Sequence, residues 1–233
     1  MTRDEYINRI KSDFAIIDVL STKNNCKVLR LRHRELGKDM VLRSYPQPLD
    51  AYDSLVKIRC ENLPELFDTI SVDDGQIVLE EYIPGMTVAQ IMESNRYHKQ
   101  GAQRIMIALC HAMETLHARG LVHRDIKPEN LIVSDAGRVV LIDFNASRQM
   151  KECSRDTVIM GTVGYTSPEQ LGLSQTDPRT DIYAAGILYN VMLTGQHPSV
   201  TFASGKVGRI VRKCTAVNPD ERYQTAAELR SAL

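Results

Sequence analysis

The sequence predicts an α+β protein built from two lobes with a cleft between them. Up to about residue 82 it carries short apolar or alternating runs, which are typical of β-strands. From Thr87 onward the apolar residues recur with the period of an α-helix. We therefore expect a small antiparallel sheet first and a mostly helical lobe after it, joined near Glu81–Pro84. The 233 residues are enough to bury a core in both lobes.

The first lobe is expected to be mostly strands, with one short helix. Gly75 follows two aspartates in a sequence that favours a hairpin turn between the last two strands. Asp50 is the expected N-terminal cap of a helix over Ala51–Cys60. The predicted strands are Phe14–Leu20, Lys27–Arg32, Lys38–Arg43, Leu66–Val72 and Gln76–Tyr82.

The second lobe is expected to contain several helices and one hairpin. An apolar stripe from Ile105 to Leu116 predicts a helix, and Gly120 lies where a helix C-terminus favours glycine. Asp135-Ala136-Gly137 predicts a hairpin turn between the short strands Leu131–Val133 and Val139–Ile142. Further helices are predicted over Asp181–Leu193, Lys206–Ala216 and Thr225–Leu233.

Composition narrows the class of protein. Lysine plus arginine and aspartate plus glutamate both number 29, so nothing indicates a general nucleic-acid binder. No apolar run approaches a membrane-spanning length, and the polar start lacks the apolar centre of a signal peptide. The five cysteines are scattered and include no C-x-x-C pair, which indicates reduced thiols rather than disulfides or zinc ligands. We expect a cytoplasmic protein with no nucleic-acid partner and no membrane segment in this chain.

The stretch LVHRDIKPENLIV, residues 121–133, carries the residue types that phosphoryl transfer needs. That reaction uses a carboxylate to receive a hydroxyl proton, positive charge near the phosphate, and oxygen ligands for magnesium. Asp125 supplies the first and Lys127 the second. Asn130 and Asp143, which ends the strand VVLID, supply the third. A lone His-Arg-Asp is most often a surface ion pair, but the full H-R-D-I-K-P-E-N followed by two strands and D-F is a specific signal.

This set of motifs resembles the eukaryotic-type (Hanks-type) serine/threonine protein kinase domain, in its bacterial form, over roughly Phe14 to Leu229. His123-Arg124-Asp125 is similar to the catalytic loop of that family, and Asp143-Phe144-Asn145 stands where its metal-binding D-F-G motif is expected. Ser167-Pro168-Glu169 resembles the A-P-E motif that ends the activation segment.

The resemblance extends to the supports of the catalytic loop. Asp181 and Gly186 match the buried helix that carries this loop, and Arg222 matches the arginine that pairs with the A-P-E glutamate, here Glu169. Thr162 is placed to contact the catalytic loop. His123, Phe144 and Leu55 look like members of an internal hydrophobic stack.

The resemblance implies one kinase-like domain over residues 1–233, with an N-lobe of about 1–82, a hinge of about 81–85 and a C-lobe of about 86–233. It implies ATP, Mg²⁺ (or Mn²⁺), and a protein substrate or regulatory partner. Asp125 would be the base, Lys127 would stabilise charge, and Asn130 with Asp143 would hold the metal. The implied nucleotide contacts are Arg43 for the phosphates, Glu81 and Ile83 of the hinge for adenine, and Val28, Val41 and Ile132 for its faces.

The first lobe departs from the family pattern in its phosphate-covering loop. Residues 20–28 lack all three glycines of L-G-x-G-x-x-G-x-V, and these glycines normally let backbone N–H groups approach phosphate. Lys23, at the loop tip, either reaches the phosphates with its ammonium group or is simply a solvated lysine in a hairpin.

The family's strand lysine is replaced by Arg43, and its helix glutamate falls on Ala51. Glu80 occupies the gatekeeper position, which is usually apolar, and strand alternation directs it toward the side of Arg43. We predict that Glu80 pairs with Arg43 in place of the missing glutamate. The alternative is a register shift of one residue, which would leave Leu79 as gatekeeper and Glu80 in water.

The activation segment and the C-lobe also bear on function. The activation segment offers Ser154 and Thr157 for phosphorylation, which Arg124, Arg148 and Arg155 would then bind; otherwise it is only a polar loop. The C-lobe lacks part of the usual region after the buried helix, which is a frequent docking surface in the family.

Three functions remain open at this point. The first is an atypical serine/threonine kinase, supported by the complete set Asp125, Lys127, Asn130 and Asp143. The second is a pseudokinase that regulates or scaffolds a partner, supported by the altered N-lobe. A kinase of small molecules fits the trimmed C-lobe, but GTVGYTSPEQ, residues 161–170, resembles the peptide-positioning segment of protein kinases.

Overall fold

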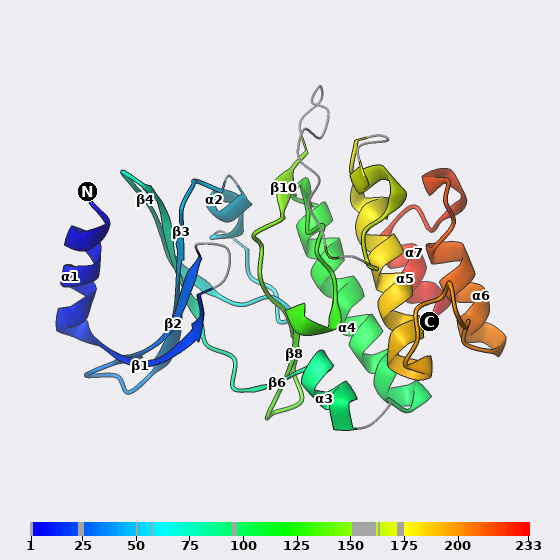
Figure 1. Ribbon diagram of the computed structural model, residues 1–233, viewed down its shortest axis with the longest axis horizontal. Coiled ribbons are helices and arrows are strands. Elements are labelled where there is room, and N and C mark those ends of the chain that lie inside the picture. The colour runs from blue at the N-terminus through cyan, green and yellow to red at the C-terminus, as the bar shows by residue number, and fades with distance from the viewer. Residues whose placement is uncertain are drawn as a thin grey trace. The chain divides into compact units, whose positions relative to one another are not determined.

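The computed structural model describes residues 2–22, 26–49, 51–56, 58–94, 97–150, 162, 164–171 and 175–233. The chain divides into a sheet unit, Met1–Arg59 with Pro64–Ile83, and a helical unit, Cys60–Leu63 with Pro84–Leu233. One unit is built on an antiparallel sheet and the other mainly on helices, which confirms the predicted two-lobed α+β class (Figure 1).

The sheet unit is a five-stranded antiparallel sheet with the order β1-β2-β3-β5-β4. Every predicted strand is present. The ends of four of them differ from the prediction by one or two residues, because the pairing of backbone groups is irregular where a strand ends. The strands are β1 (Phe14–Ser21), β2 (Lys27–His33), β3 (Asp39–Tyr45), β4 (Leu66–Val72) and β5 (Gly75–Glu81).

The register of the sheet separates its residues into two faces. Val28 lies opposite Arg43, and Val41 lies opposite Glu80, so these four side chains share one face. The other face carries an apolar cluster that includes Leu29, Leu31, Met40, Leu42, Ile77 and Leu79. Leu79 and Glu80 therefore point to opposite sides, as strand alternation requires.

An N-terminal helix, α1 (Arg3–Asp13), was not predicted from the sequence. Tyr6 is buried in the apolar cluster, and the Arg3 guanidinium donates to the Tyr45 carbonyl (3.0 Å) and to Asp74 Oδ1 (2.9 Å). The helix begins with a capping box, in which Thr2 and Glu5 each accept the other's backbone N–H. This Thr-x-x-Glu pattern was the available signal for the helix.

The predicted helix over Ala51–Cys60 is shorter than expected. Helix α2 covers only Ala51–Leu55, and Asp50, its predicted cap, lies outside the described residues. After α2, residues Cys60–Leu63 belong to the helical unit, where Asn62 Nδ2 donates to the Val139 carbonyl (2.8 Å) and the Leu141 N–H donates to the Asn62 carbonyl (3.0 Å). The Ile58 N–H donates to the carbonyl of Leu55 (2.9 Å), three residues back instead of four, so the α-helical pattern does not continue beyond α2.

The turn between β4 and β5 needs its glycine. Gly75 has φ +145°, and a Cβ atom at this position would lie 1.9 Å from the Tyr45 carbonyl oxygen. The predicted hairpin is therefore present, and its glycine allows β5 to pass close to the end of β3.

The helical unit contains the predicted helices and hairpin, together with short elements that the sequence did not reveal. Among its described residues no helix combines the length and the apolar character that crossing a membrane requires. Its helices are α3 (Val88–Ser94), α4 (Lys99–His117), α5 (Pro178–Thr194), α6 (Gly205–Cys214) and α7 (Ala226–Ala232). Its strands are β6 (Gly85–Thr87), β7 (Leu121–Val122), β8 (Leu131–Ser134), β9 (Val139–Leu141) and β10 (Arg148–Gln149), and 3₁₀ turns cover Pro128–Asn130, Pro168–Leu171 and Pro219–Glu221.

Helix α5 is the buried centre of this unit and packs against α4 and α6 (Figure 1). A Cβ atom on Gly186 would lie 2.3 Å from Cys214 Cβ, so glycine permits the close approach of α5 and α6. Only Gly195–Ser204 separates these two helices, as expected from the short sequence between them.

Candidate active site

Asp125 is the centre of a polar cluster in the helical unit. Its carboxylate accepts hydrogen bonds from Lys127 Nζ (2.7 Å), Thr162 Oγ1 (2.7 Å) and Asn130 Nδ2 (3.0 Å). Lys127 Nζ also donates to Thr162 Oγ1 at 2.7 Å. The predicted contact of Thr162 with the catalytic loop is therefore present, and three of the predicted catalytic residues lie together.

The electrostatics of this cluster keep Asp125 ionised. Burial alone would raise the pKa of Asp125, but the hydrogen bonds from Lys127 and Thr162 and the charge of Lys127 outweigh it. The pKa of Asp125 is therefore lower than that of an ordinary aspartate, and its carboxylate is an acceptor at neutral pH.

Asn130 and Asp143 are brought together by the β8–β9 hairpin. Leu131 lies opposite Leu141, and the Ile142 N–H donates to the Asn130 carbonyl (2.9 Å), so Asp143 follows directly beside Asn130. Asp143 has a left-handed backbone with φ +69°, which is uncommon for a residue other than glycine. Among the described residues no group of three or more His, Cys, Asp or Glu side chains is arranged to hold a metal ion.

The catalytic loop is held in place by the carboxylate of Asp181 in the first turn of α5. Asp181 accepts from the backbone N–H groups of His123 (2.9 Å) and Arg124 (2.8 Å), and it contacts His117 Nε2 at 2.8 Å. Burial opposes its ionisation, but the bond with His117 and the charges of His117 and His123 lower the pKa of Asp181 below its usual value. The role of His117 was missed, because only folding brings the end of α4 next to α5.

Arg124 connects this loop to the segment that follows Asp143. It has φ +68° and is buried, and burial together with the charge of nearby Arg148 lowers the pKa of its guanidinium. Its carbonyl accepts from Gln170 Nε2 at 2.8 Å. Ser154, Thr157 and Arg155, which were predicted to take part in regulation, lie outside the described residues.

Two further predicted contacts are present in the helical unit. The rings of His123 and Phe144 meet edge to face with centroids 5.3 Å apart. Arg222 binds Glu169 through two hydrogen bonds of 2.6 and 2.9 Å, and Thr180 Oγ1 adds a third at 3.0 Å. Burial would raise the pKa of Glu169, but the bonds from Arg222 and Thr180 lower it below its ordinary value. Arg222 and Thr180, the latter in α5, together hold the end of the activation segment.

The sheet unit contains the predicted pair of Arg43 and Glu80. Arg43 Nε donates to Glu80 Oε1 at 2.6 Å, and the two residues are only 7% and 1% exposed. The alternative register, with Glu80 in water, is therefore wrong. Two charges of opposite sign neutralise each other inside the unit, where an isolated charge would be costly.

The other predicted nucleotide contacts fall into two sets. In the sheet unit, Val28 and Val41 lie on the face that carries Arg43, while the Glu81 N–H is committed to the Glu65 carbonyl (2.8 Å) and Ile83 is buried. In the helical unit, Ile132 lies in β8 opposite Val140. Lys23 lies outside the described residues.

Comparison with known proteins agrees with this geometry. The profile of the protein kinase domain family matches residues 26–231. The chain is 30% identical over 213 residues to a probable serine/threonine-protein kinase of Corynebacterium efficiens, covering 76% of this chain and 32% of that protein. It is 31% identical over 183 residues to the serine/threonine-protein kinase PknB of Mycobacterium leprae, covering 67% of this chain and 29% of that protein.

These curated relatives are much longer proteins, and the chain spans about a third of their length or less. The family profile, by contrast, covers nearly all of the chain, including the catalytic loop, the β8–β9 hairpin and α5. This chain therefore belongs to the protein kinase domain family.

Proposed function

We propose that residues 1–233 form one serine/threonine protein kinase domain, which transfers the γ-phosphate of ATP to a hydroxyl group of a protein. The observation that carries the proposal is the contact of Asp125 with both Lys127 and Thr162, at 2.7 Å each. An ionised carboxylate beside an ammonium group suits a reaction that moves a proton off a hydroxyl while negative charge develops on phosphate. The related proteins named above are serine/threonine-protein kinases.

In this mechanism the substrate hydroxyl approaches Asp125. As its oxygen forms a bond to the γ-phosphorus, the bond from that phosphorus to the bridging oxygen of ADP breaks, and the hydroxyl proton passes to the Asp125 carboxylate. Lys127 stabilises the negative charge on the transferring group. The lowered pKa of Asp125 means that the carboxylate needs no prior deprotonation at neutral pH.

The residues beside Asp125 fit a magnesium ion. Asn130 Nδ2 donates both to the Asp125 carbonyl (2.8 Å) and to its carboxylate, which leaves Asn130 Oδ1 as the oxygen ligand on that side chain. Amide and carboxylate oxygens are the donors that Mg²⁺ and Mn²⁺ prefer. We assign Asn130 and Asp143 to this ion, which would neutralise charge on the ATP phosphates when bound.

Arg43 is assigned to the phosphates in place of the usual lysine. Its Nε donates to Glu80, so the carboxylate orients the planar guanidinium, a group whose shape and charge suit phosphate oxygens. Lys23 is proposed as a second cation. The residues proposed for adenine are Glu81, Ile83, Val28, Val41 and Ile132, as the family resemblance implies.

The second candidate function is a binding module without chemistry. It is favoured by the loss of all three glycines from residues 20–28 and by Ala51, a small buried residue, at the position of the usual helix glutamate. A chain of this kind would hold a partner protein rather than transfer phosphate. The two functions differ in whether ATP binding requires the metal ligands.

A thermal melt with ATP, with and without Mg²⁺, tests the nucleotide site on the wild type and on Asp143→Asn. Ligand at about a hundred times its dissociation constant adds about 2.7 kcal/mol of stability, which raises the midpoint of a chain of this size by about 5–10 °C. We expect a magnesium-dependent rise that Asp143→Asn abolishes. No shift at millimolar ATP would instead support the binding module.

A phosphotransfer assay then tests the chemistry. With radiolabelled ATP and a serine-containing protein substrate, Asp125→Asn is expected to lower the rate by about 10²- to 10⁴-fold, because the amide cannot accept the proton. The melt with ATP should be the same for Asp125→Asn as for the wild type. Equal rates for the two proteins would contradict the role of Asp125 and leave nucleotide binding intact.

A further inference from the structure

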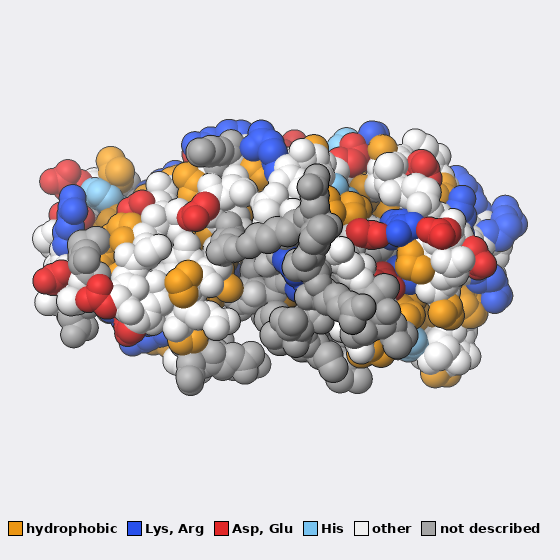
Figure 2. Space-filling model, turned by 90° about the horizontal axis from the view of Figure 1, so that it is seen from above, with side chains coloured by type: hydrophobic (Ala, Val, Ile, Leu, Met, Phe, Trp, Pro, Cys, Tyr) orange, Lys and Arg blue, Asp and Glu red, His pale blue; other side chains and the backbone are white. Residues whose placement is uncertain are grey.

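Helix α6 presents a basic face to solvent. Its apolar residues Val207, Ile210, Val211 and Cys214 are buried, whereas every basic residue of the helix is exposed. The sequence contains no Asp or Glu between Asp181 and Asp220, so no acidic residue of this stretch offsets the charge. Lys and Arg side chains gather at the end of the helical unit where α6 lies (Figure 2). The basic residues of α6 are Lys206, Arg209, Arg212 and Lys213.

An apolar hollow of about 190 Å³ lies on one side of α6. The Arg212 guanidinium stacks over the Phe202 ring at 4.0 Å from its centroid, so a cation stands at the rim of this hollow. The Gly195–Ser204 connection before α6 forms one wall of the hollow. Its lining includes Tyr183, Ile187, His197, Pro198, Phe202 and Thr215.

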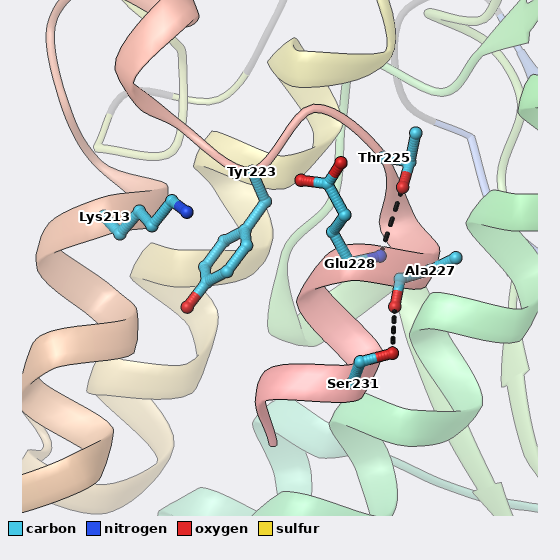
Figure 3. A pocket seen from close by; sticks show the side chains of 6 residues that line it. All are labelled: Lys213, Tyr223, Thr225, Ala227, Glu228 and Ser231. Carbon is cyan, nitrogen blue, oxygen red and sulfur yellow. Dashed lines mark hydrogen bonds between the residues drawn. The ribbon is translucent and has the colours of Figure 1, made fainter.

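A second hollow, of about 430 Å³, lies on the other side of α6 toward α7. Figure 3 shows the Lys213 amine directed at the Tyr223 ring, and the ammonium nitrogen lies 4.3 Å from the ring centroid. Glu228 also lines this hollow, and its carboxylate accepts the Gln224 N–H at 2.9 Å, so this hollow carries one acidic side chain beside Lys213. Each hollow therefore has one basic residue of α6 at its rim.

We propose that α6 and its two flanking hollows form a docking surface for an acidic segment of a partner protein. Aspartate or glutamate side chains of the segment would face Arg209, Arg212 and Lys213, and an apolar side chain between them would enter the hollow that Phe202 lines. Helix α6 is ten residues long. This length is about 15 Å, roughly four or five residues of an extended peptide.

The geometry favours a protein segment over other polyanions. The exposed faces of Phe202 and Tyr223 are covered by Arg212 and Lys213, so they do not offer platforms on which nucleic-acid bases stack. A membrane-binding amphipathic helix inserts its apolar face into lipid, but the apolar face of α6 is buried in the unit. A recessed apolar hollow beside exposed cations suits an acidic peptide that carries one apolar anchor.

This inference goes beyond the proposed function, because docking of the segment does not require phosphate transfer. For an active kinase, the surface would select substrate proteins that carry an acidic docking segment. Binding is therefore measured without ATP, and on Asp125→Asn as well as on the wild type, so that a lack of activity cannot be mistaken for a lack of docking.

The experiment follows the fluorescence anisotropy of a labelled peptide made of aspartate, serine and one central phenylalanine. The whole chain is compared with Arg209→Glu/Arg212→Glu and with the matched control Arg34→Glu/Arg119→Glu, which reverses two exposed arginines elsewhere. We expect the α6 variant to weaken binding by about tenfold or more, and the control to bind within about twofold of the wild type. Raising the ionic strength from about 0.05 M to about 0.3 M should weaken the wild-type complex.

Three further probes complete the test: the same peptide with lysine for aspartate, phosphatidylserine vesicles, and a single-stranded oligonucleotide. We expect none of them to compete with the acidic peptide. The proposal is overturned if the α6 variant binds the peptide as tightly as the control, or if vesicles or oligonucleotide bind α6 while the peptide does not. Equal melting midpoints for the two double variants establish that a loss of binding is not a loss of folding.

Discussion

At the scale of single residues, Arg43 and Glu80 each look unfavourable alone and compensate each other when paired. A buried carboxylate without a partner would be costly, and so would a buried guanidinium without one. Their 2.6 Å contact removes both costs. In the function that we propose, Glu80 takes the role of the helix glutamate that pairs with the strand lysine in the protein kinases that this chain resembles.

The pair makes a testable prediction for Glu80→Met. The substitution leaves Arg43 charged and buried without its carboxylate, so we expect the free energy of unfolding to fall by about 3–5 kcal/mol. It should also weaken ATP binding, because the guanidinium loses the group that orients it. Urea unfolding and the ATP-dependent melt measure the two effects.

The double variant Arg43→Met/Glu80→Met is the control for this prediction. It removes both charges and fills the space with apolar side chains, so it should recover most of the lost stability but not ATP binding. If Glu80→Met is as stable as the wild type and binds ATP equally well, the pairing has no energetic role.

At the scale of elements, the packing of α5 against α6 depends on the absence of a side chain. Gly186 lies in the middle of α5, where glycine normally weakens a helix. Here the missing side chain lets α5 and α6 approach closely, because a Cβ at position 186 would lie 2.3 Å from Cys214 Cβ. The interface therefore favours glycine at the expense of helix propensity.

We expect Gly186→Ala to destabilise the protein by about 1–3 kcal/mol, because the methyl group forces α5 and α6 apart. Gly101→Ala in α4 is the matched control. The nearest atom to its added Cβ would be Tyr97 Cδ1 at 3.4 Å, so this change is expected to be neutral or to stabilise by up to about 1 kcal/mol. Chemical denaturation of both variants checks the prediction, and a stable Gly186→Ala would contradict the close packing.

At the scale of the whole molecule, one buried carboxylate organises much of the helical unit. Asp181 joins α5 to the catalytic loop through two backbone N–H groups and to the end of α4 through His117. Because these partners come from distant parts of the sequence, their bonds form only when the unit is folded. Loss of this carboxylate is expected to affect stability and catalytic-loop geometry together.

Asp181→Asn is expected to lower the free energy of unfolding by about 2–4 kcal/mol, because the amide cannot accept from both N–H groups and His117. Asp135→Asn, in the exposed β8–β9 turn, is the matched control and should change little. Urea unfolding at neutral pH measures both variants. A loss no larger than that of the control would show that the buried carboxylate is dispensable.

The same contact predicts a dependence on pH. The folded-state pKa of Asp181 is below that of an unfolded aspartate, so the ionised group stabilises the fold at neutral pH. This contribution is complete above the unfolded pKa of about 4 and is lost as pH falls through the lower folded value. The difference in melting midpoint between the wild type and Asp181→Asn should therefore be constant near neutrality and shrink in acid.

The family pattern together with strand alternation predicted the pairing of Glu80 with Arg43. Local sequence patterns were enough to predict the strands, the two hairpins and the set Asp125, Lys127, Asn130 and Asp143, which we propose to be catalytic. These depend on local patterns: alternation along a strand, glycine and aspartate in turns, and motifs a few residues long. Helix α1 was missed although its capping box was visible at Thr2 and Glu5, because strand patterns dominate the residues after it.

Contacts between segments far apart in the sequence became known only from the folded chain. Asn62 bonds to β9, and His117 reaches Asp181 because α4 packs on α5. The basic face of α6 lies between two hollows because neighbouring elements form their walls. Contacts of this kind depend on the pairing of segments far apart in the chain, and no local period or motif specifies that pairing.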